Sequence, residues 1–233
     1  MRRALRVSGR QTVKTKLLAN AMTERLWSEQ ILWDSDFRRV AGVDEVGRGA
    51  LAGPLVSAAV IFPSDLRVGA LANDLCCVND SKLLSPKERR RLAPIITGAA
   101  IAVAVSMVGV DEIDAFGIAA ANRIAMERAV DLLSVAPDAL LLDATVIDRA
   151  PPQIGLIDGD TCSLSIAAAS ILAKVARDRF MEDYHGVDHR YGFHLHKGYG
   201  TALHLAALAH HGPCSLHRQS FAPVARCMAS LLT

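Results

Sequence analysis

No stretch of this sequence is apolar over the length that crossing a membrane requires. The longest apolar run, at about residues 99–110, is well short of the ~20 residues of a membrane-spanning helix. The basic N-terminus, with Arg2, Arg3 and Arg6, is followed by no apolar segment like that of a secretory signal. These two absences predict a protein that neither spans a membrane nor carries an export signal.

Cysteine is scarce, and the five cysteines have no spacing that suggests disulfides. An odd number in this arrangement is typical of a reducing compartment, so we expect the protein to be cytoplasmic. The 233 residues, of which 51% are hydrophobic, are enough to form the core of one domain with an appendage. This composition excludes a chain that is disordered throughout.

Acidic residues are absent from both ends of the chain. Residues 1–23 contain six Lys and Arg, residues 189–233 contain four together with seven His, and neither segment contains Asp or Glu. All 24 acidic residues therefore lie in the middle. An acidic centre between basic ends fits an enzyme that binds a polyanion.

Short apolar runs and helical periodicities follow one another irregularly along the chain. "SPKE", at residues 85–88, is a capping box with proline at the first helical position, so it predicts the start of a helix. Asp111 is the expected cap of a helix over residues 111–133, and a long helix is expected over residues 163–184. Strands are expected at residues 39–46, 55–62, 101–108, 139–142 and 153–157.

This irregular order favours an α/β fold, with a mixed central sheet flanked by helices, over a purely parallel sheet. We divide the chain into a basic N-terminal extension (residues 1–35), a catalytic domain (residues 36–185) and a small helical C-terminal extension (residues 186–233). We expect Trp27 and Trp33 to pack the N-terminal extension against the core.

Three of the predicted strands end in acidic residues. "VAGVDE" ends in Asp44 and Glu45, "LLLDA" contains Asp143, and "GLIDGD" contains Asp158 and Asp160. If these strand ends meet in one sheet, the carboxylates converge, and hard oxygen ligands of this kind suit Mg²⁺ or Mn²⁺. Two such ions assist phosphodiester cleavage. The alternative for any single position is a loop or helix-cap role, and we keep that interpretation for Asp158.

The adjacency of Asp44 and Glu45 raises a geometric problem. Successive side chains of a strand point to opposite faces, so both carboxylates reach one site only if the strand bends. Gly42 and Gly47 flank the pair, and we expect them to permit that bend.

Several segments, in this order, resemble the ribonuclease HII family: "AGVDEVGRGALAGPLVSAAVIF", "NDSKLLS", "EIDAFGIAAANRIAMERAV", "SIAAASILAKVARD", "YGFHLHKGYGTALH" and "HRQSFAPV". The resemblance extends from about residue 38 to residue 224, and it implies a ribonuclease H-like fold. It also implies metal-dependent cleavage of the RNA strand in RNA–DNA hybrids. Single ribonucleotides embedded in duplex DNA would be cut on their 5′ side, leaving a 3′-hydroxyl and a 5′-phosphate, which serves ribonucleotide removal from DNA.

The resemblance also assigns site residues. It implies two Mg²⁺ or Mn²⁺ ions as cofactors, held by the catalytic carboxylates Asp44, Glu45, Asp143 and Asp160. The backbone of Gly47, Arg48 and Gly49 is expected to read the ribose 2′-hydroxyl, the group that distinguishes RNA from DNA. Tyr199 is expected to stack on the sugar at the RNA–DNA junction.

Three positions depart from the common pattern of this family. Ala50 stands in place of a proline, Leu83 in place of a second lysine, and Ala144 in place of a glycine. The second change removes one phosphate contact. None of the three replaces a metal ligand or the tyrosine, so they bear on affinity and turnover and not on the reaction.

Other polar residues are candidate substrate contacts. Ser81 and Lys82 in "NDSK" are either phosphate contacts or an ordinary polar turn. Lys174 shares a helix face with Ser170 and Arg177, and that face either lies along a phosphate backbone or is solvated. For Lys174 we favour contact with the backbone.

The histidine-rich C-terminal region contains further candidates. We expect His196 and Lys197 near the substrate because they closely precede Tyr199. Arg218 either contacts nucleic acid or anchors the tail of the chain. A zinc site in "HHGPCSLH" is disfavoured, because its His and Cys spacing is not that of a standard zinc finger.

Two other functions stay open. One is another nuclease of the ribonuclease H fold, such as a resolvase, that acts on DNA, and the other is a hybrid-binding module without turnover. The Gly-Arg-Gly segment with "HKGYGT" argues against the first, and the four intact carboxylates argue against the second. We expect a monomer that binds RNA–DNA hybrids and ribonucleotide-containing DNA duplexes. "RCMASLLT" at the C-terminus lacks an apolar-aromatic motif for docking on a sliding clamp.

Overall fold

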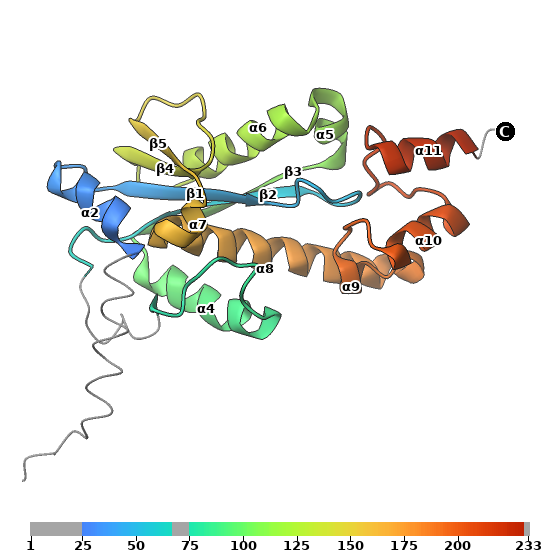
Figure 1. Ribbon diagram of the computed structural model, residues 1–233, viewed down its shortest axis with the longest axis horizontal. Coiled ribbons are helices and arrows are strands. Elements are labelled where there is room, and N and C mark those ends of the chain that lie inside the picture. The colour runs from blue at the N-terminus through green and yellow to red at the C-terminus, as the bar shows by residue number, and fades with distance from the viewer. Residues whose placement is uncertain (1–24, 67–74, 231–233) are drawn as a thin grey trace, which may run out of the picture.

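A five-stranded sheet lies between two layers of helices (Figure 1). The computed structural model describes residues 25–66 and 75–230. The strand order is β3-β2-β1-β4-β5, with antiparallel β3-β2 and β2-β1 pairs and parallel β1-β4 and β4-β5 pairs. The expected mixed sheet is confirmed, and its strands are β1 (Val40–Val46), β2 (Leu55–Ile61), β3 (Ala102–Val108), β4 (Ala139–Asp143) and β5 (Gln153–Leu156).

Helix α8 (Leu164–Val187) covers one face of the sheet, and α6 (Ile118–Asp131) covers the other (Figure 1). Helix α4 (Pro86–Ala99) packs against α8 on its outer side. The C-terminal helices lie at the opposite end of the molecule from α2, as Figure 1 shows. The other helices are α2 (Trp27–Asp34), α5 (Val110–Phe116), α7 (Gly159–Cys162), η1 (His189–Tyr191), α9 (Phe193–His196), α10 (Ala202–His211) and α11 (Ala222–Ser230).

Alternation along the strands divides the core between the two helix layers. Val40 in β1 belongs to the cluster that α8 completes with Ile166. Ala41 and Val43 of the same strand belong to the cluster on the other face, which contains Met126 of α6. Because successive side chains of β1 alternate in this way, the two residues that follow Val43 also face different layers.

Gly42 allows α8 to lie directly against β1. A Cβ atom at this position would lie 2.2 Å from the backbone carbon of Ser165 and 2.4 Å from the backbone nitrogen of Ile166. Heavy atoms do not approach so closely, so the missing side chain sets the distance between helix and strand. The expected bend at Gly42 is wrong, because β1 keeps a regular register with β2 from Ala41 to Val46.

The helix boundaries confirm one predicted cap and contradict the other. The Ser85 hydroxyl accepts a hydrogen bond from the Glu88 amide in a complete capping box, and the Ser163 hydroxyl caps α8. The single helix expected over residues 111–133 is instead two helices, with no cap at Asp111. Gly117 separates them because its φ of 76° lies in the left-handed region, where a right-handed helix cannot continue.

Helix α2 joins the N-terminal side of the chain to the core through Trp33, which is 3% exposed. Trp27 is 66% exposed, so its expected role in packing is wrong. Glu29 is fully buried, and its Oε1 accepts hydrogen bonds from the Ser163 hydroxyl (2.6 Å) and from the Ser165 amide (2.8 Å) and hydroxyl. This carboxylate therefore meets the N-terminus of α8, where the helix dipole favours negative charge. Residues 1–24 lie outside the described residues.

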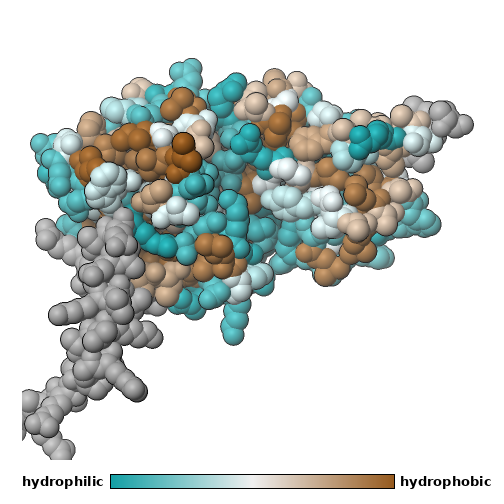
Figure 2. Space-filling model, in the orientation of Figure 1, coloured by the Kyte–Doolittle hydropathy of each residue, from teal (hydrophilic) through white to brown (hydrophobic). Residues whose placement is uncertain are grey.

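Figure 2 shows hydrophobic side chains on the surface over β5 and the loop before it, where Val146, Ile154 and Ile157 are exposed. Within residues 25–66 and 75–230, no helix is long and apolar enough to cross a bilayer. All five cysteines lie in the described part of the chain, and none forms a disulfide.

Replacing Gly42 by alanine should lower the free energy of unfolding by at least about 2 kcal/mol, because the new methyl group meets backbone atoms that cannot rotate away. The matched control is Gly98→Ala in α4, where an added Cβ has no neighbour within 4 Å. That change should raise stability by up to about 1 kcal/mol through helix propensity. Urea unfolding of both variants checks this, and equal midpoints would contradict the assigned role of Gly42.

Candidate functional site

The carboxyl ends of two parallel strands bring the first two carboxylates together. Val43 of β1 pairs with Leu142 of β4, so Asp44 and Asp143 occupy the next position on neighbouring strands. Asp160 follows β5 on the short helix α7. The loop that carries it is held to Asp143, whose Oδ1 accepts a hydrogen bond of 2.9 Å from the amide of Gly159.

Asp44 and Glu45 point to opposite faces of β1 and still belong to one site. The Ser170 hydroxyl of α8 hydrogen bonds to Asp44, and the Asn122 side chain of α6 hydrogen bonds to Glu45. Both carboxylates interact electrostatically with Asp143. The strand does not bend, so the site lies across the end of the sheet. Side chains from the helices on both faces of the sheet contact it.

Burial makes this group of carboxylates costly to ionise. Burial, followed by repulsion from Glu45, raises the pKa of Asp44 to about 8. Burial also raises the pKa of Glu45 and, together with the nearby Asp80, the pKa of Asp160. A bound proton or a bound cation therefore stabilises the folded protein at this point.

The donor set fits a hard divalent cation, because it consists of carboxylate oxygens whose ionised forms are destabilised without a positive charge. In the described part of the chain, no three His, Cys, Asp or Glu side chains are already arranged as a metal-binding group. The chemistry of the ligands is therefore in place, whereas their coordination geometry is not preformed.

The loop after β1 turns sharply and pairs with the segment that contains Tyr199. Gly47 has a φ of 99°, and a Cβ there would lie 2.3 Å from Nε of Arg177. Ala50 forms an antiparallel bridge with Tyr199, and the Leu51 amide donates to the Gly198 carbonyl (2.8 Å). The predicted sugar-reading segment and the predicted stacking residue are thus adjacent.

Two buried arginines hold this loop through its backbone carbonyls. Arg177, which has no exposed surface, donates to the carbonyl oxygens of Pro54 (2.9 Å), Lys197 (2.9 Å) and Ala52 (3.1 Å). Of the two alternatives considered for the helix face that it shares with Lys174, a phosphate backbone or solvent, neither describes Arg177, because its guanidinium is buried against these carbonyl oxygens.

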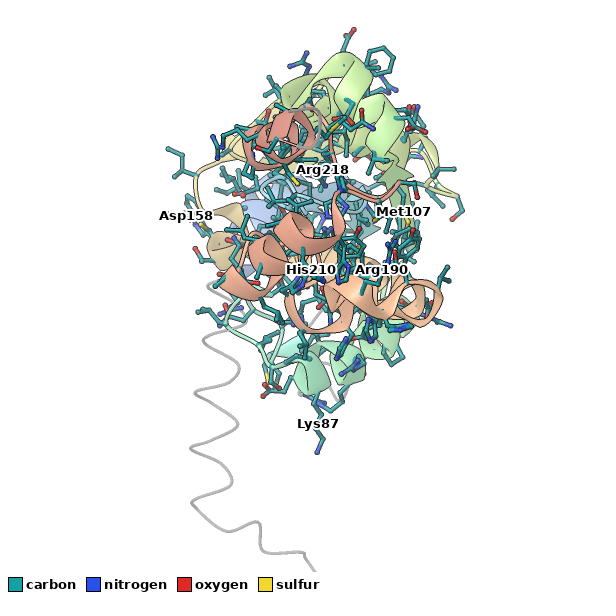
Figure 3. The ribbon with its side chains drawn as sticks, turned by 90° about the vertical axis from the view of Figure 1, so that its right-hand side faces the viewer. Lys87, Met107, Asp158, Arg190, His210 and Arg218 are labelled. Carbon is teal, nitrogen blue, oxygen red and sulfur yellow. The ribbon has the colours of Figure 1, made fainter. Side chains whose placement is uncertain are left out.

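Arg218 is the second of these arginines, and it anchors the chain. Its guanidinium donates to the carbonyl oxygens of Gly53 (2.9 Å) and Arg48 (3.0 Å). Figure 3 shows Arg218 between the C-terminal helices, whereas Lys87 projects into solvent. Of the two roles considered for Arg218, the structure therefore supports the anchor.

A model of the family described as Ribonuclease HII matches residues 41–224. The chain belongs to the ribonuclease HII family. It is 50% identical over 204 residues to the Ribonuclease HII of Lactobacillus acidophilus, an alignment that covers 88% of this chain and 78% of that relative. Membership of the ribonuclease HII family identifies the chain as an enzyme of the ribonuclease H class.

Two solved structures share the fold of this ribonuclease HII family member. The ribonuclease H2 from Pyrococcus horikoshii OT3 has a TM-score of 0.72 and 24% identity, over 84% of this chain and 99% of that one. Bst-RNase HIII in complex with Mn²⁺ has a TM-score of 0.63 and 22% identity, over 83% of this chain and 70% of that one. With the mixed sheet described above, these neighbours confirm the ribonuclease H-like fold.

The remaining predicted substrate contacts of the chain differ in exposure. Ser81 is 4% exposed, and its hydroxyl lies 2.8 Å from that of Ser170. The Lys82 side chain is 79% exposed, and its Nζ lies 3.5 Å from Oδ2 of Asp160. Lys174 is largely buried and donates to Asp178 over 2.7 Å. Of these candidates, only Lys82 extends from the carboxylates into solvent.

His196 and Lys197 are both engaged within the protein. His196 is 8% exposed and hydrogen bonds to the Tyr191 carbonyl and the Gly198 amide. Lys197 forms an ion pair of 2.9 Å with Glu182. Their roles toward substrate stay predictions.

One departure from the family pattern has a visible backbone consequence. Ala144 directly follows Asp143 and has a φ of 48°, in the left-handed region that glycine adopts without strain. An L-residue there costs about 1 kcal/mol. Ala50 is fully buried in its bridge with Tyr199, and Leu83 is 70% exposed.

In metal-free buffer, the free energy of unfolding should fall as the pH rises from 5 to 8. The raised pKa of Asp44, about 8, means that the folded chain keeps a proton that the unfolded chain releases near pH 4. Stability therefore falls with pH across this window. Asp44→Asn removes this titration. Between pH 5 and pH 8 the free energy of unfolding of the variant should therefore fall by at least about 2 kcal/mol less than that of the wild type.

Urea unfolding in EDTA at several pH values measures this difference. Asp65→Asn, which removes an exposed carboxylate, is the control and should follow the wild type. The same pH dependence in the wild type and in Asp44→Asn would show that Asp44 ionises freely in the folded protein.

Proposed function

We propose that this chain is a metal-dependent endonuclease that hydrolyses the RNA strand of RNA–DNA hybrids. It also cuts duplex DNA on the 5′ side of a single embedded ribonucleotide, leaving a 3′-hydroxyl and a 5′-phosphate. Its role is removal of ribonucleotides from DNA in the cytoplasm. One observation carries the proposal: Ala50, five residues after Glu45 of the adjacent Asp44–Glu45 pair, forms an antiparallel bridge with Tyr199.

Recognition of ribose rests on backbone that approaches the sugar closely. A Cβ at Gly49 would have no protein neighbour within 4 Å, so this position leaves room for a ligand. Tyr199 is partly exposed, and the cationic groups of Arg177 and Lys174 lie 5.2 and 5.7 Å from its ring centroid. We assign the 2′-hydroxyl to the backbone of Gly47–Gly49 and the junction sugar to the ring of Tyr199.

Asp44, Glu45, Asp143 and Asp160 would hold two Mg²⁺ or Mn²⁺ ions. The chemistry that such ions supply is activation of water and stabilisation of the departing oxygen. Lys82 binds a substrate phosphate beside Asp160, and Ser170 orients the carboxylate of Asp44. The oxygen of water bonds to phosphorus while the bond from phosphorus to the 3′-oxygen of the preceding nucleotide breaks. The phosphate therefore stays on the 5′-oxygen of the ribonucleotide.

The proposal also covers the assembly state and the substrates. We propose that the enzyme acts as a monomer on RNA–DNA hybrids and on DNA duplexes that contain ribonucleotides.

The deciding experiment uses duplex DNA with one ribonucleotide, in Mg²⁺, in Mn²⁺ and in EDTA, and maps the product ends. Wild type should cut 5′ to the ribonucleotide with either metal and not in EDTA. Asp44→Asn should lower kcat at least about a thousandfold, because it removes a charged metal ligand. Tyr199→Ala should lower activity about tenfold, which is the size of a lost stacking contact.

The alternatives predict other products. Cutting of an all-DNA duplex would identify a resolvase-like nuclease. Binding to the hybrid without product under both metals would identify a hybrid-binding module.

Lys82→Ala should raise KM about threefold to tenfold and make its dependence on salt concentration shallower, because one phosphate contact is lost. Lys87→Ala is the matched control, since Lys87 is an exposed lysine that projects into solvent at the first turn of α4 (Figure 3). Steady-state kinetics at several NaCl concentrations measure both. Equal salt slopes for the two variants would remove Lys82 from the substrate site.

A further inference from the structure

Three buried histidines lie directly behind Tyr199. His204 and His217 are at most 1% exposed, and His196 is 8% exposed. The rings of His196 and His204 stack with centroids 4.4 Å apart and planes 13° apart. Phe193 packs against all three rings. Buried polar nitrogens need hydrogen-bond partners, so the partners of each ring determine where its proton lies.

The hydrogen bonds assign opposite tautomers to His217 and His204. The backbone amide of Cys214 donates to Nδ1 of His217 over 3.0 Å, so in the neutral ring Nε2 carries the proton. This Nε2 lies 3.1 Å from Nε2 of His204, which must therefore accept. The proton of His204 is then on Nδ1, which donates to the carbonyl oxygen of Tyr199 over 3.0 Å.

The third histidine does not compete for Tyr199. Nδ1 of His196 accepts from the Gly198 amide (3.2 Å), so its Nε2 donates to the Tyr191 carbonyl (2.8 Å). Burial lowers the pKa of His204 and of His217 to about 4. Both rings are therefore neutral near pH 7, and the chain of donors runs in one direction from Cys214 to Tyr199.

This chain joins the two segments that enclose the loop after β1. Tyr199 bridges to Ala50 on one side of the loop, and His217 bridges to Ala52 on the other. The Gly53 amide also donates to the Leu216 carbonyl (2.8 Å). A displacement of either segment breaks the contact between the two imidazoles.

We propose that His217 and His204 form a two-imidazole relay that fixes the backbone of Tyr199, and hence its ring, against the Gly47–Gly49 segment. They are positioning residues, because neither lies at the carboxylates. The inference rests on the function proposed above, in which Tyr199 stacks on the junction sugar. It predicts that a hydrogen-bond donor at the Nδ1 position of His204 matters, and not only the volume of the ring.

A pair of substitutions at one position separates positioning from packing. Asparagine places its amide nitrogen near the position of Nδ1, whereas glutamine places its own near Nε2. His204→Asn keeps the donor to Tyr199, so kcat for cleavage at a single ribonucleotide should change at most about twofold. His204→Gln loses that donor and should lower kcat about tenfold. Equal losses in the two variants would overturn the relay.

A double-mutant cycle shows whether His204 acts through Tyr199. In a Tyr199→Ala background, His204→Gln should change kcat by less than about twofold, because the ring that it positions is gone. A tenfold effect that persists in this background would overturn the inference. Thermal melting of each variant establishes that the compared proteins are folded.

The wild-type protein supplies a test that needs neither a variant nor a substrate. Long-range ¹H–¹⁵N NMR at pH 7 should show His204 protonated on Nδ1 and His217 protonated on Nε2. The same tautomer in both rings, or a doubly protonated ring, would overturn the relay. If the wild type does not cut duplex DNA at a ribonucleotide and yet shows these tautomers, the proposed function fails while the hydrogen-bond relay stands.

Discussion

The close contact between α8 and β1 is the constraint on which the site depends. Gly42 leaves the space into which Ser165 and Ile166 fit, and this contact sets where the later turns of α8 lie. Further along the same helix, Ser170 meets Asp44, Arg177 meets the loop after β1, and Met181 packs where Gly53 has no side chain. One helix thus aligns the carboxylates with the loop proposed to read the sugar.

The positively charged side chains near the site form two groups, one buried and one exposed. Arg177 and Arg218 are buried, and burial lowers the pKa of each below its usual value, to about 9 for Arg218. They bind backbone carbonyls, so they organise the loop and do not neutralise the carboxylates. Lys82 and Arg48 are exposed and lie 3.5 Å from Asp160 and 3.7 Å from Glu45. The exposed charges thus lie beside the carboxylates, whereas the buried ones hold the backbone.

Local sequence patterns predicted most of the sheet, because each strand is a short apolar run that ends at a turn residue or an acid. They also predicted the cap at Ser85, which depends only on neighbouring residues. The break at Gly117 was missed because one glycine is tolerated in many helices, and only its left-handed φ ends this one. The internal roles of Arg177 and His204 were missed because their partners lie in segments distant along the chain.

The buried carboxylate of Glu29 has a consequence for defining the domain. The division at residue 35, drawn from composition, would separate Glu29 from the helix whose N-terminus it meets. An excised catalytic domain that began there would leave the Ser163 and Ser165 hydroxyls and the Ser165 amide without their acceptor. Trp33 would also leave the core. We therefore expect the smallest autonomous unit of this enzyme to begin before α2, and a truncation series across residues 25–36 would locate its edge.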